Sequence, residues 1–279
     1  MKPSNLRRIG AHLSTTGGID LAVVHAAEMG ANCIQVFSGS PRMWRRTPLQ
    51  NIDAVKVWAA QEKFDVRPIF THALYLVNLA SDKPELVELS TQTLIHDLNF
   101  DAHIKGAGVV VHLGSHQGRG FEASKTQLVD QIKKILAATP EAATFLIENS
   151  AGQNGKIASD LGEIRWLLDQ VNSKRLGWCF DTCHGFAAGF ELKAVGQKIT
   201  ELGLWESLKV IHINDSRDPF DSGRDRHDNI GAGNIPAESL KTFLNLPEIA
   251  QIPLITEAPG LDGNGPDAEN IARIKKILS

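Results

Sequence analysis

The stretch 176–184 of the sequence reads Leu-Gly-Trp-Cys-Phe-Asp-Thr-Cys-His. Its first five residues form a short apolar run of β-type residues, which predicts a buried strand. Asp181 follows at the point where we expect this strand to give way to a loop. A buried carboxylate without a partner is costly, so Asp181 must be paired, hydrogen-bonded or bound to a metal.

Short apolar runs alternate with longer amphipathic segments along the whole chain. The runs predict strands at 8–12, 33–37, 67–71, 108–111, 144–147, 176–180, 208–211 and 252–256. The amphipathic segments predict helices at 17–29, 52–64, 84–105, 122–138, 159–171, 193–204, 236–246 and 267–278. Strict alternation favours parallel strands with right-handed crossovers, and a (β/α)8 barrel usually takes about 250 residues. We therefore expect an α/β fold, a single TIM barrel over 1–279, with a doubly wound open sheet as the alternative.

The composition is that of a globular protein, with 42% hydrophobic residues among 279. The first nine residues are polar and basic, and no apolar run approaches the length of a membrane span, so we expect a cytoplasmic protein without membrane contact. Cys33, Cys179 and Cys183 lack the spacing of a disulfide framework and are expected to be buried thiols. The formal net charge of −3 argues mildly against nucleic-acid binding, although it omits any bound metals.

A histidine or a carboxylate ends each of six successive expected strands, from the third to the eighth. In chain order these residues are His72, His112, Glu148, Asp181, His212 and Glu257. In a barrel, the carboxyl ends of the strands form one ring around one pocket. His184 lies just beyond Asp181, and the loop after the seventh strand adds Asp225 and His227. Their spacing of two puts the last pair on one side of an extended segment.

These nine imidazoles and carboxylates would be electrostatically unfavourable together without cations. Mixed nitrogen and oxygen ligands suit zinc, manganese or iron. A catalytic zinc takes about three protein ligands and keeps one position open, so nine ligands with one bridging carboxylate accommodate about three metals. Such a centre would carry net positive charge and favour an anionic substrate. A polar rim without metals is the alternative.

Nine short motifs follow one another along nearly the whole chain. They are Gly-Ala-His-Leu-Ser at 10–14, Ser-Pro-Arg-Met-Trp at 40–44, His-Ala-Leu-Tyr-Leu-Val-Asn at 72–78, Val-His-Leu-Gly-Ser-His at 111–116, Ile-Glu-Asn-Ser-Ala-Gly at 147–152, Phe-Asp-Thr-Cys-His at 180–184, His-Ile-Asn-Asp-Ser at 212–216, Asp-Arg-His at 225–227 and Glu-Ala-Pro-Gly at 257–260. In this order they resemble the endonuclease IV family of apurinic/apyrimidinic (AP) endonucleases. The sequence departs from the family pattern at Leu74, where a small or polar residue is usual, and at Trp178, where a small one is.

The resemblance implies a barrel with three zinc ions per chain, with manganese as an alternative at one or more sites. On the matching positions the ligands would be His72, His112 and Glu148 for one zinc, Glu148, Asp181, His212 and Glu257 for a second, and His184, Asp225 and His227 for the third. Glu148 would bridge two metals and would also be the catalytic residue. The implied function lies in DNA base excision repair, as hydrolysis of the phosphodiester 5′ to an abasic site, leaving a 3′-hydroxyl and a 5′-deoxyribose phosphate. The family also implies 3′-phosphodiesterase activity.

The expected DNA contacts lie in the loops above the barrel. Residues 40–46 combine arginines with Trp44, a mix suited to phosphates and bases. By resemblance, Arg42, Tyr75 and Leu76 would enter double-stranded DNA at the lesion while the abasic nucleotide is flipped into the pocket. We expect a monomer, because a duplex must reach the pocket.

Two other classes of protein stay open at this point. A single-metal TIM-barrel sugar isomerase or epimerase would need only the quartet Glu148, Asp181, His212 and Glu257, and the five other candidate ligands would be redundant. A DNA-damage-binding or zinc-storage protein would not be an enzyme, and the bridging position expected for Glu148 weighs against it. Turnover of an abasic duplex would distinguish all three.

Overall fold

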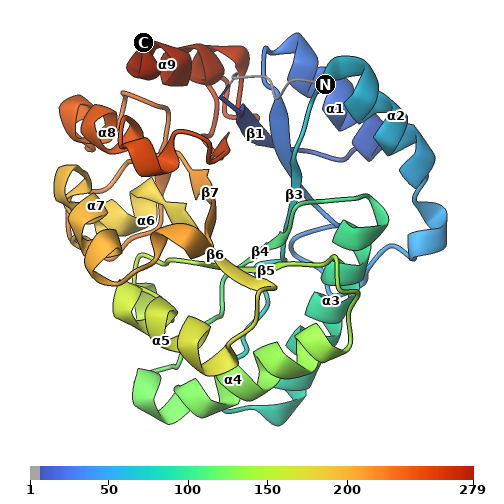
Figure 1. Cartoon of the computed structure of the whole chain (residues 1–279), viewed down its shortest axis with the longest axis vertical. Helices are drawn as coiled ribbons and strands as arrows, with labels where there is room; N and C mark the ends of the chain where they lie inside the picture. The colour runs from blue at the N-terminus through green and yellow to red at the C-terminus, as the bar shows by residue number, and fades with distance from the viewer. Residues whose placement is uncertain (1–6) are drawn as a thin grey trace.

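The computed structural model describes residues 7–279, so the first six residues of the expected domain lie outside the described part. Eight parallel strands close into a barrel in the order β1-β10-β7-β6-β5-β4-β3-β2. The helices surround this barrel on the outside (Figure 1). The first and last strands of the barrel pair directly, with Ile9 beside Leu254. The expected TIM barrel is therefore confirmed, and the open sheet is wrong.

Each expected strand and helix occurs close to its expected bounds. The barrel strands are β1 (Ile9–Leu13), β2 (Cys33–Phe37), β3 (Ile69–His72), β4 (Val109–Val111), β5 (Phe145–Glu148), β6 (Leu176–Asp181), β7 (Leu208–His212) and β10 (Leu254–Thr256). The α-helices are α1 (Ile19–Glu28), α2 (Ala54–Phe64), α3 (Pro84–His103), α4 (Phe121–Ala137), α5 (Leu161–Val171), α6 (Thr182–Ala187), α7 (Leu192–Glu201), α8 (Ala237–Leu244) and α9 (Ala268–Leu278).

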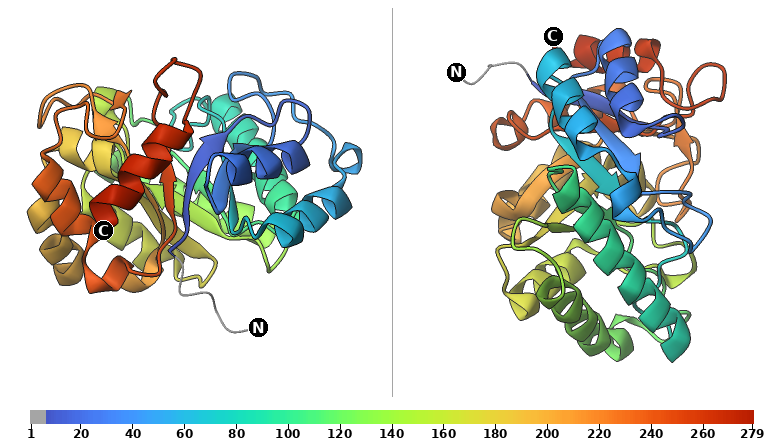
Figure 2. Two further views of the ribbon diagram at one scale, coloured as in Figure 1. Left: turned by 90° about the horizontal axis from the view of Figure 1, so that it is seen from above. Right: turned by 90° about the vertical axis from the view of Figure 1, so that its right-hand side faces the viewer.

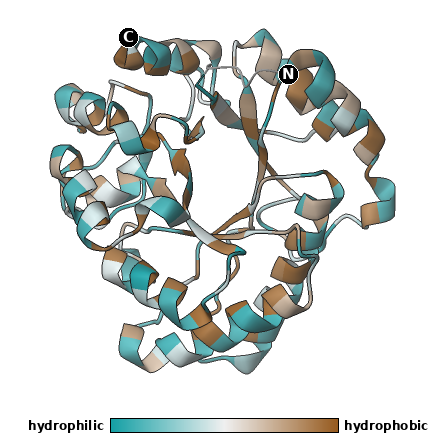
Figure 3. Cartoon of the chain, in the orientation of Figure 1, coloured by the Kyte–Doolittle hydropathy of each residue, from teal (hydrophilic) through white to brown (hydrophobic). Residues whose placement is uncertain are grey.

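Both faces of the barrel strands are buried almost throughout, as their near-continuous apolar sequences predict, and Lys209 in β7 is an exposed exception. The outer faces pack against the helices in one large core, and Figure 3 shows apolar residues along the strands and mixed polarity on the helices. The inner faces form a second cluster made of Cys33, Phe70, Val110, Leu146, Cys179, Val210 and Ile255. Apolar side chains therefore fill the barrel interior below the ends of the strands.

The segment after β6 is the main difference from the expected elements. The expected loop after Asp181 is absent, since α6 begins at the next residue. Asp181 caps this helix, because its carboxylate accepts a hydrogen bond of 2.9 Å from the backbone N–H of His184. The helix expected at 193–204 is the shorter α7. Helix α6 has six residues, too few for apolar periodicity to reveal it. The hairpin of β8 (Asp215–Ser216) and β9 (His227–Asp228) was not predicted either, because each of its strands has only two residues.

The three cysteines and the unusual tryptophan are all buried. Cys33, Cys179 and Cys183 are free thiols, as expected. The indole N–H of Trp178 donates to the carbonyl of Leu204 at 2.9 Å, which satisfies the polar atom of this fully buried side chain. Within residues 7–279, the helices include none that is both long and apolar enough to cross a membrane.

Candidate metal centre

Six of the predicted ligands lie at the carboxyl ends of barrel strands. His72, Glu148, Asp181 and His212 end β3, β5, β6 and β7, and His112 and Glu257 directly follow β4 and β10. Each comes two residues after a member of the inner cluster, as Phe70 precedes His72 and Leu146 precedes Glu148. Because side chains alternate along a strand, all six turn toward the barrel axis.

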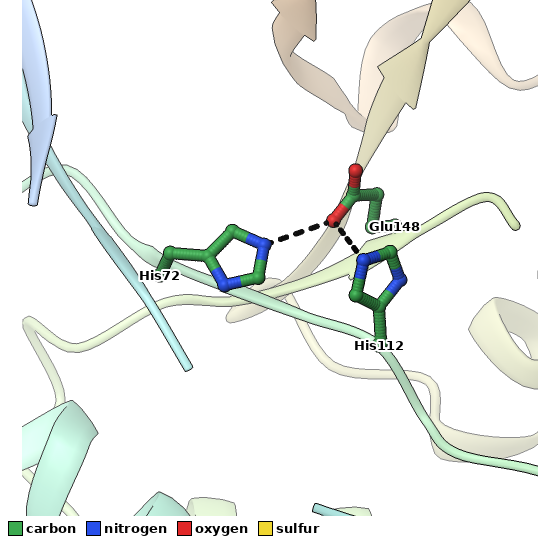
Figure 4. A group of neighbouring side chains, drawn as sticks. All are labelled: His72, His112 and Glu148. Carbon is green, nitrogen blue, oxygen red and sulfur yellow. Dashed lines mark hydrogen bonds and ion pairs between the residues drawn. The ribbon is translucent and has the colours of Figure 1, made fainter. Parts of the chain in front are cut away.

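Glu148 lies at the centre of the group and is fully buried. Its Oε2 is 3.2 Å from Nε2 of His72 and 3.2 Å from Nε2 of His112 (Figure 4). Its Oε1 is 3.0 Å from Nδ1 of His212 and 3.3 Å from Nδ1 of His184. Each carboxylate oxygen therefore faces two imidazoles, which is the arrangement a bridging carboxylate requires.

Asp181, His212 and Glu257 extend this cluster around Glu148. His212 Nδ1 lies 3.3 Å from Glu257 Oε2 and 3.8 Å from Asp181 Oδ2. Glu148, Asp181, His212 and Glu257 form one group whose ligand atoms all lie within 4.8 Å of one another, and His72, His112 and Glu148 form another. The structure thus brings together the first two expected ligand sets.

The residues of the third expected set lie close together, but they also lie close to ligands of the other two sets. Asp225 Oδ1 is 2.9 Å from His184 Nε2 and 3.6 Å from His227 Nε2. His184 and His227 form a compact group with Asp181, whereas His184 and Asp225 form one with His112. Asp181 therefore lies between the second and third sets.

The donor set fits metal ions. Nε2 of His227 is buried without a hydrogen-bond partner and lies 3.6 Å from Oδ2 of Asp181 and 3.6 Å from Oδ1 of Asp225. These separations exceed ordinary hydrogen-bond distances and leave the nitrogen facing two carboxylates. Nitrogen and carboxylate oxygen are ligands that zinc and related transition metals prefer.

The protonation of the cluster reflects a balance between burial and charge. Burial alone would raise the pKa of Glu148, but the charges of His112 and His212 and hydrogen bonds from the histidines outweigh it, so its pKa lies well below its usual range. Burial opposes protonation of His184, yet the nearby carboxylates raise its pKa well above its ordinary value. For His112, burial dominates and lowers the pKa to about 4. Glu148 is therefore held as a carboxylate, the form that binds metals.

Polar residues that the sequence analysis missed hold these ligands in place. Gln35 is fully buried in β2, where its Nε2–H donates to Glu257 at 2.8 Å and its Oε1 lies 2.8 Å from Nε2 of His212. The side-chain N–H of Asn214 donates to Asp181 Oδ2 at 2.7 Å. The sequence could have indicated Gln35, because it is a polar residue in an otherwise apolar strand. It follows the inward-facing Cys33 by two residues, so its side chain should also face the barrel interior.

The three predicted DNA-contacting residues lie at the mouth of the site. Tyr75 is 60% exposed, and its ring packs edge-on against His72 with centroids 6.0 Å apart. Leu76 is also exposed. The backbone N–H of Tyr75 donates to the carbonyl of Pro41 at 3.2 Å, which places the exposed Arg42 beside the same rim. The structure therefore brings the loops after β2 and β3 together.

Arg46 differs from the other arginines of its loop. Its guanidinium donates to the carbonyl of Ser40 at 2.7 Å and to the Ser38 hydroxyl at 3.2 Å, and it also contacts the carbonyl of Met43. Its donors thus hold the loop that carries Arg42. Arg46 is half-buried, whereas Arg45 is exposed.

An open cavity of about 610 Å³ adjoins the cluster. Its lining includes the candidate ligands Glu257 and His227, the nearby His12 and Tyr75, and the loop residues Gly263, Gly265 and Pro266. The loop between β10 and α9, drawn in red in the left view of Figure 2, rises above the barrel beside this opening. The cavity gives a large substrate direct access to the candidate metal centre.

Fold and site together define a class: TIM-barrel proteins in which the strand ends assemble a cluster of histidines and carboxylates able to hold several metals. The family model described as "Xylose isomerase-like TIM barrel" matches residues 23–277. A protein named probable endonuclease 4 from Methanoculleus marisnigri is 34% identical over 277 residues, covering 96% of this chain and 98% of that protein. The crystal structure of endonuclease IV from Thermus thermophilus matches with a TM-score of 0.84 and 32% identity over 97% of this chain and 98% of that one.

The chain therefore belongs to the endonuclease IV family, and the expected family and enzyme class, a nuclease, are confirmed. The barrel itself is shared more widely. A 3-keto-D-glucoside 4-epimerase from E. coli matches with a TM-score of 0.70 at 15% identity, covering 98% of this chain and 99% of that one, a likeness of fold alone. The alternative of a sugar isomerase or epimerase is thus consistent with the barrel fold, but the sequence relatives place this chain in the endonuclease IV family.

Proposed function

We propose that this chain is an AP endonuclease that holds three zinc ions and hydrolyses the phosphodiester 5′ to an abasic site in double-stranded DNA. Manganese is an alternative at one or more of the sites, and 3′-phosphodiesterase activity uses the same centre. The observation that carries the proposal is the buried Glu148, whose two oxygens each face two histidines. A structural carboxylate would not need four imidazole neighbours in an otherwise apolar barrel.

The proposed ligands divide into three sets, and Glu148 belongs to the first two. His72, His112 and Glu148 would hold one metal, Glu148, Asp181, His212 and Glu257 a second, and His184, Asp225 and His227 a third. When bound, the metals activate water, neutralise phosphate oxygens and stabilise the leaving alkoxide. Glu148, kept ionised by its neighbours, orients the attacking water from its buried position. Gln35 and Asn214 keep the carboxylates of Glu257 and Asp181 aimed at the cluster.

The products distinguish this hydrolysis from a lyase mechanism. With a synthetic duplex carrying one abasic site, we expect the zinc-loaded protein to leave a 3′-hydroxyl that a polymerase extends directly and a 5′-deoxyribose phosphate. No lysine Schiff base takes part, so borohydride should trap no covalent protein–DNA adduct. A trapped adduct, or no incision of the abasic strand by fully metal-loaded protein, would contradict the proposal, and an intact duplex is the matched control.

The mouth residues should govern recognition of the lesion rather than the chemistry. An abasic nucleotide has lost stacking, so extruding it costs less than extruding a paired one, and Tyr75 and Leu76 can fill the vacated space. We expect Tyr75→Ala with Leu76→Ala to reduce the preference for abasic over intact duplex by roughly tenfold to a hundredfold, because aromatic stacking contributes about 1–3 kcal/mol per base.

This prediction is measured as the ratio of dissociation constants for abasic and intact duplex, with the metal content determined in parallel. Leu89→Ala on α3 is a suitable control, because it also removes an exposed apolar side chain but lies outside the predicted wedge. Equal loss of affinity for both duplexes would show that Tyr75 and Leu76 are general contacts and do not sense the lesion.

A further inference from the structure

Lys156 brings a cationic side chain to the edge of the candidate centre. Its Nζ lies 3.1 Å from Oδ2 of Asp225. Among residues 7–279, no other lysine or arginine forms an ion pair with any of the nine predicted ligands. The sequence analysis did not single out this lysine, because its partner is 69 residues away in the chain.

The backbone around Lys156 is fixed against the loop that follows β4. Lys156 forms an isolated antiparallel bridge with Ser115. On either side of it, the His116 N–H donates to the carbonyl of Gly155 at 3.0 Å, and the Ile157 N–H donates to that of Gly114 at 2.9 Å. Lys156 therefore starts near the His112 side of the centre and reaches across to Asp225.

The two oxygens of Asp225 face different partners. Oδ1 faces Nε2 of His184 at 2.9 Å and Nε2 of His227 at 3.6 Å, whereas Oδ2 faces Lys156. A metal bound through Oδ1 and the two histidines would leave the contact between Oδ2 and Lys156 in place. The ammonium group would then pair with the carboxylate oxygen that the third proposed metal does not use.

The ammonium group has donors to spare. It carries three N–H groups, and only one acceptor, Asp225 Oδ2, pairs with it in the described part of the chain. Its side chain is 32% exposed, so it can be reached from solvent. A phosphate oxygen placed against the metals would come within reach of these donors.

We propose that Lys156 is a phosphate-binding residue of this centre and donates a charge-assisted hydrogen bond to a non-bridging oxygen of the substrate phosphodiester. This inference rests on the proposed function and deepens it, because it assigns the recognition of the reacting phosphate to a side chain as well as to metals. A lysine ammonium is a compact charge on a flexible side chain, so it can keep its hydrogen bond to the phosphate as the geometry of the phosphate changes during the reaction.

The test compares Lys156→Met, Lys156→Arg and Lys174→Met in zinc-loaded protein. Lys174 is an exposed lysine between α5 and β6, at the opposite end of the barrel, so its substitution removes the same charge away from the centre. We expect Lys156→Met to raise KM for the abasic duplex roughly tenfold, because hydrogen bonds to charged groups are the stronger ones. Loss of one phosphate contact should also make the log–log salt dependence of KM shallower by about one.

The controls separate phosphate binding from a structural role. Lys156→Arg should keep most of the affinity and the salt slope, Lys174→Met should change neither, and all variants should hold the same number of metals. An unchanged salt slope in Lys156→Met, or loss of a metal from it, would overturn the proposal, the latter because Lys156 would then serve to orient Asp225.

A second measurement does not depend on the abasic substrate. Lys156→Met should weaken the binding of inorganic phosphate to the zinc-loaded protein by roughly tenfold, measured by calorimetry. If the wild-type protein bound phosphate through Lys156 but failed to incise abasic DNA, the proposed function would fail and the inference would stand. Equal phosphate affinity in Lys156→Met and the wild type would overturn the inference whatever the incision assay showed.

Discussion

Replacing Glu148 with glutamine is expected to lower the incision of an abasic duplex by several orders of magnitude while the protein stays folded. Glutamine keeps the size of the side chain but removes the charge on which the four surrounding histidines converge. A neutral amide is a poor bridging ligand, and its N–H group would point toward an imidazole or a metal where an acceptor is required. The orientation of the attacking water would be lost with it.

Single-turnover kinetics would measure this loss, with duplex binding and circular dichroism recorded on the same preparation. Glu163→Gln is a matched control, because it makes the same change at a partly buried carboxylate that accepts its hydrogen bond from the backbone of Ala158 and lies on α5, outside the cluster. Binding of the abasic duplex should be largely kept in Glu148→Gln. Turnover near that of the wild type would refute the role assigned to Glu148.

Complete removal of the metals is expected to abolish incision, and zinc should restore it. The candidate ligands include four carboxylates that lie close together, and bound cations would make this pocket attractive to a phosphodiester. Nine ligands with a shared carboxylate correspond to about three ions per chain. Elemental analysis of the reactivated protein should therefore give about three zinc ions.

The restored activity should be followed as zinc is added back in steps, with the free metal buffered by a chelator. A matched sample kept in chelator controls for irreversible unfolding. A fully active protein with a single metal per chain would contradict the three-metal proposal and would favour a centre built on the quartet of Glu148, Asp181, His212 and Glu257 alone. Full activity in the presence of strong chelator would exclude metals from the reaction altogether.

The barrel and most of the candidate ligands could be predicted from local sequence patterns. Eight apolar runs alternating with amphipathic segments leave few topologies, because parallel strands need right-handed crossovers. Once the strands are parallel and closed, a residue such as His72 or Glu148 at a strand end must turn inward two positions after an inner-core side chain. The ligands converge because each of these strands, by its own alternation of side chains, turns the residue at its end toward the barrel axis.

How these residues share their contacts could not be predicted in this way. Gln35 contacts both Glu257 and His212, and Lys156 contacts Asp225, although these residues come from different strands and loops. Asp181 also caps α6, a helix that the sequence pattern did not predict. Short elements such as α6 and the β8–β9 hairpin carry too few residues for a periodic pattern. Contacts between residues distant in sequence follow from loop conformation and from the closure of the barrel, which no local pattern encodes, so these pairings became visible only in the folded chain.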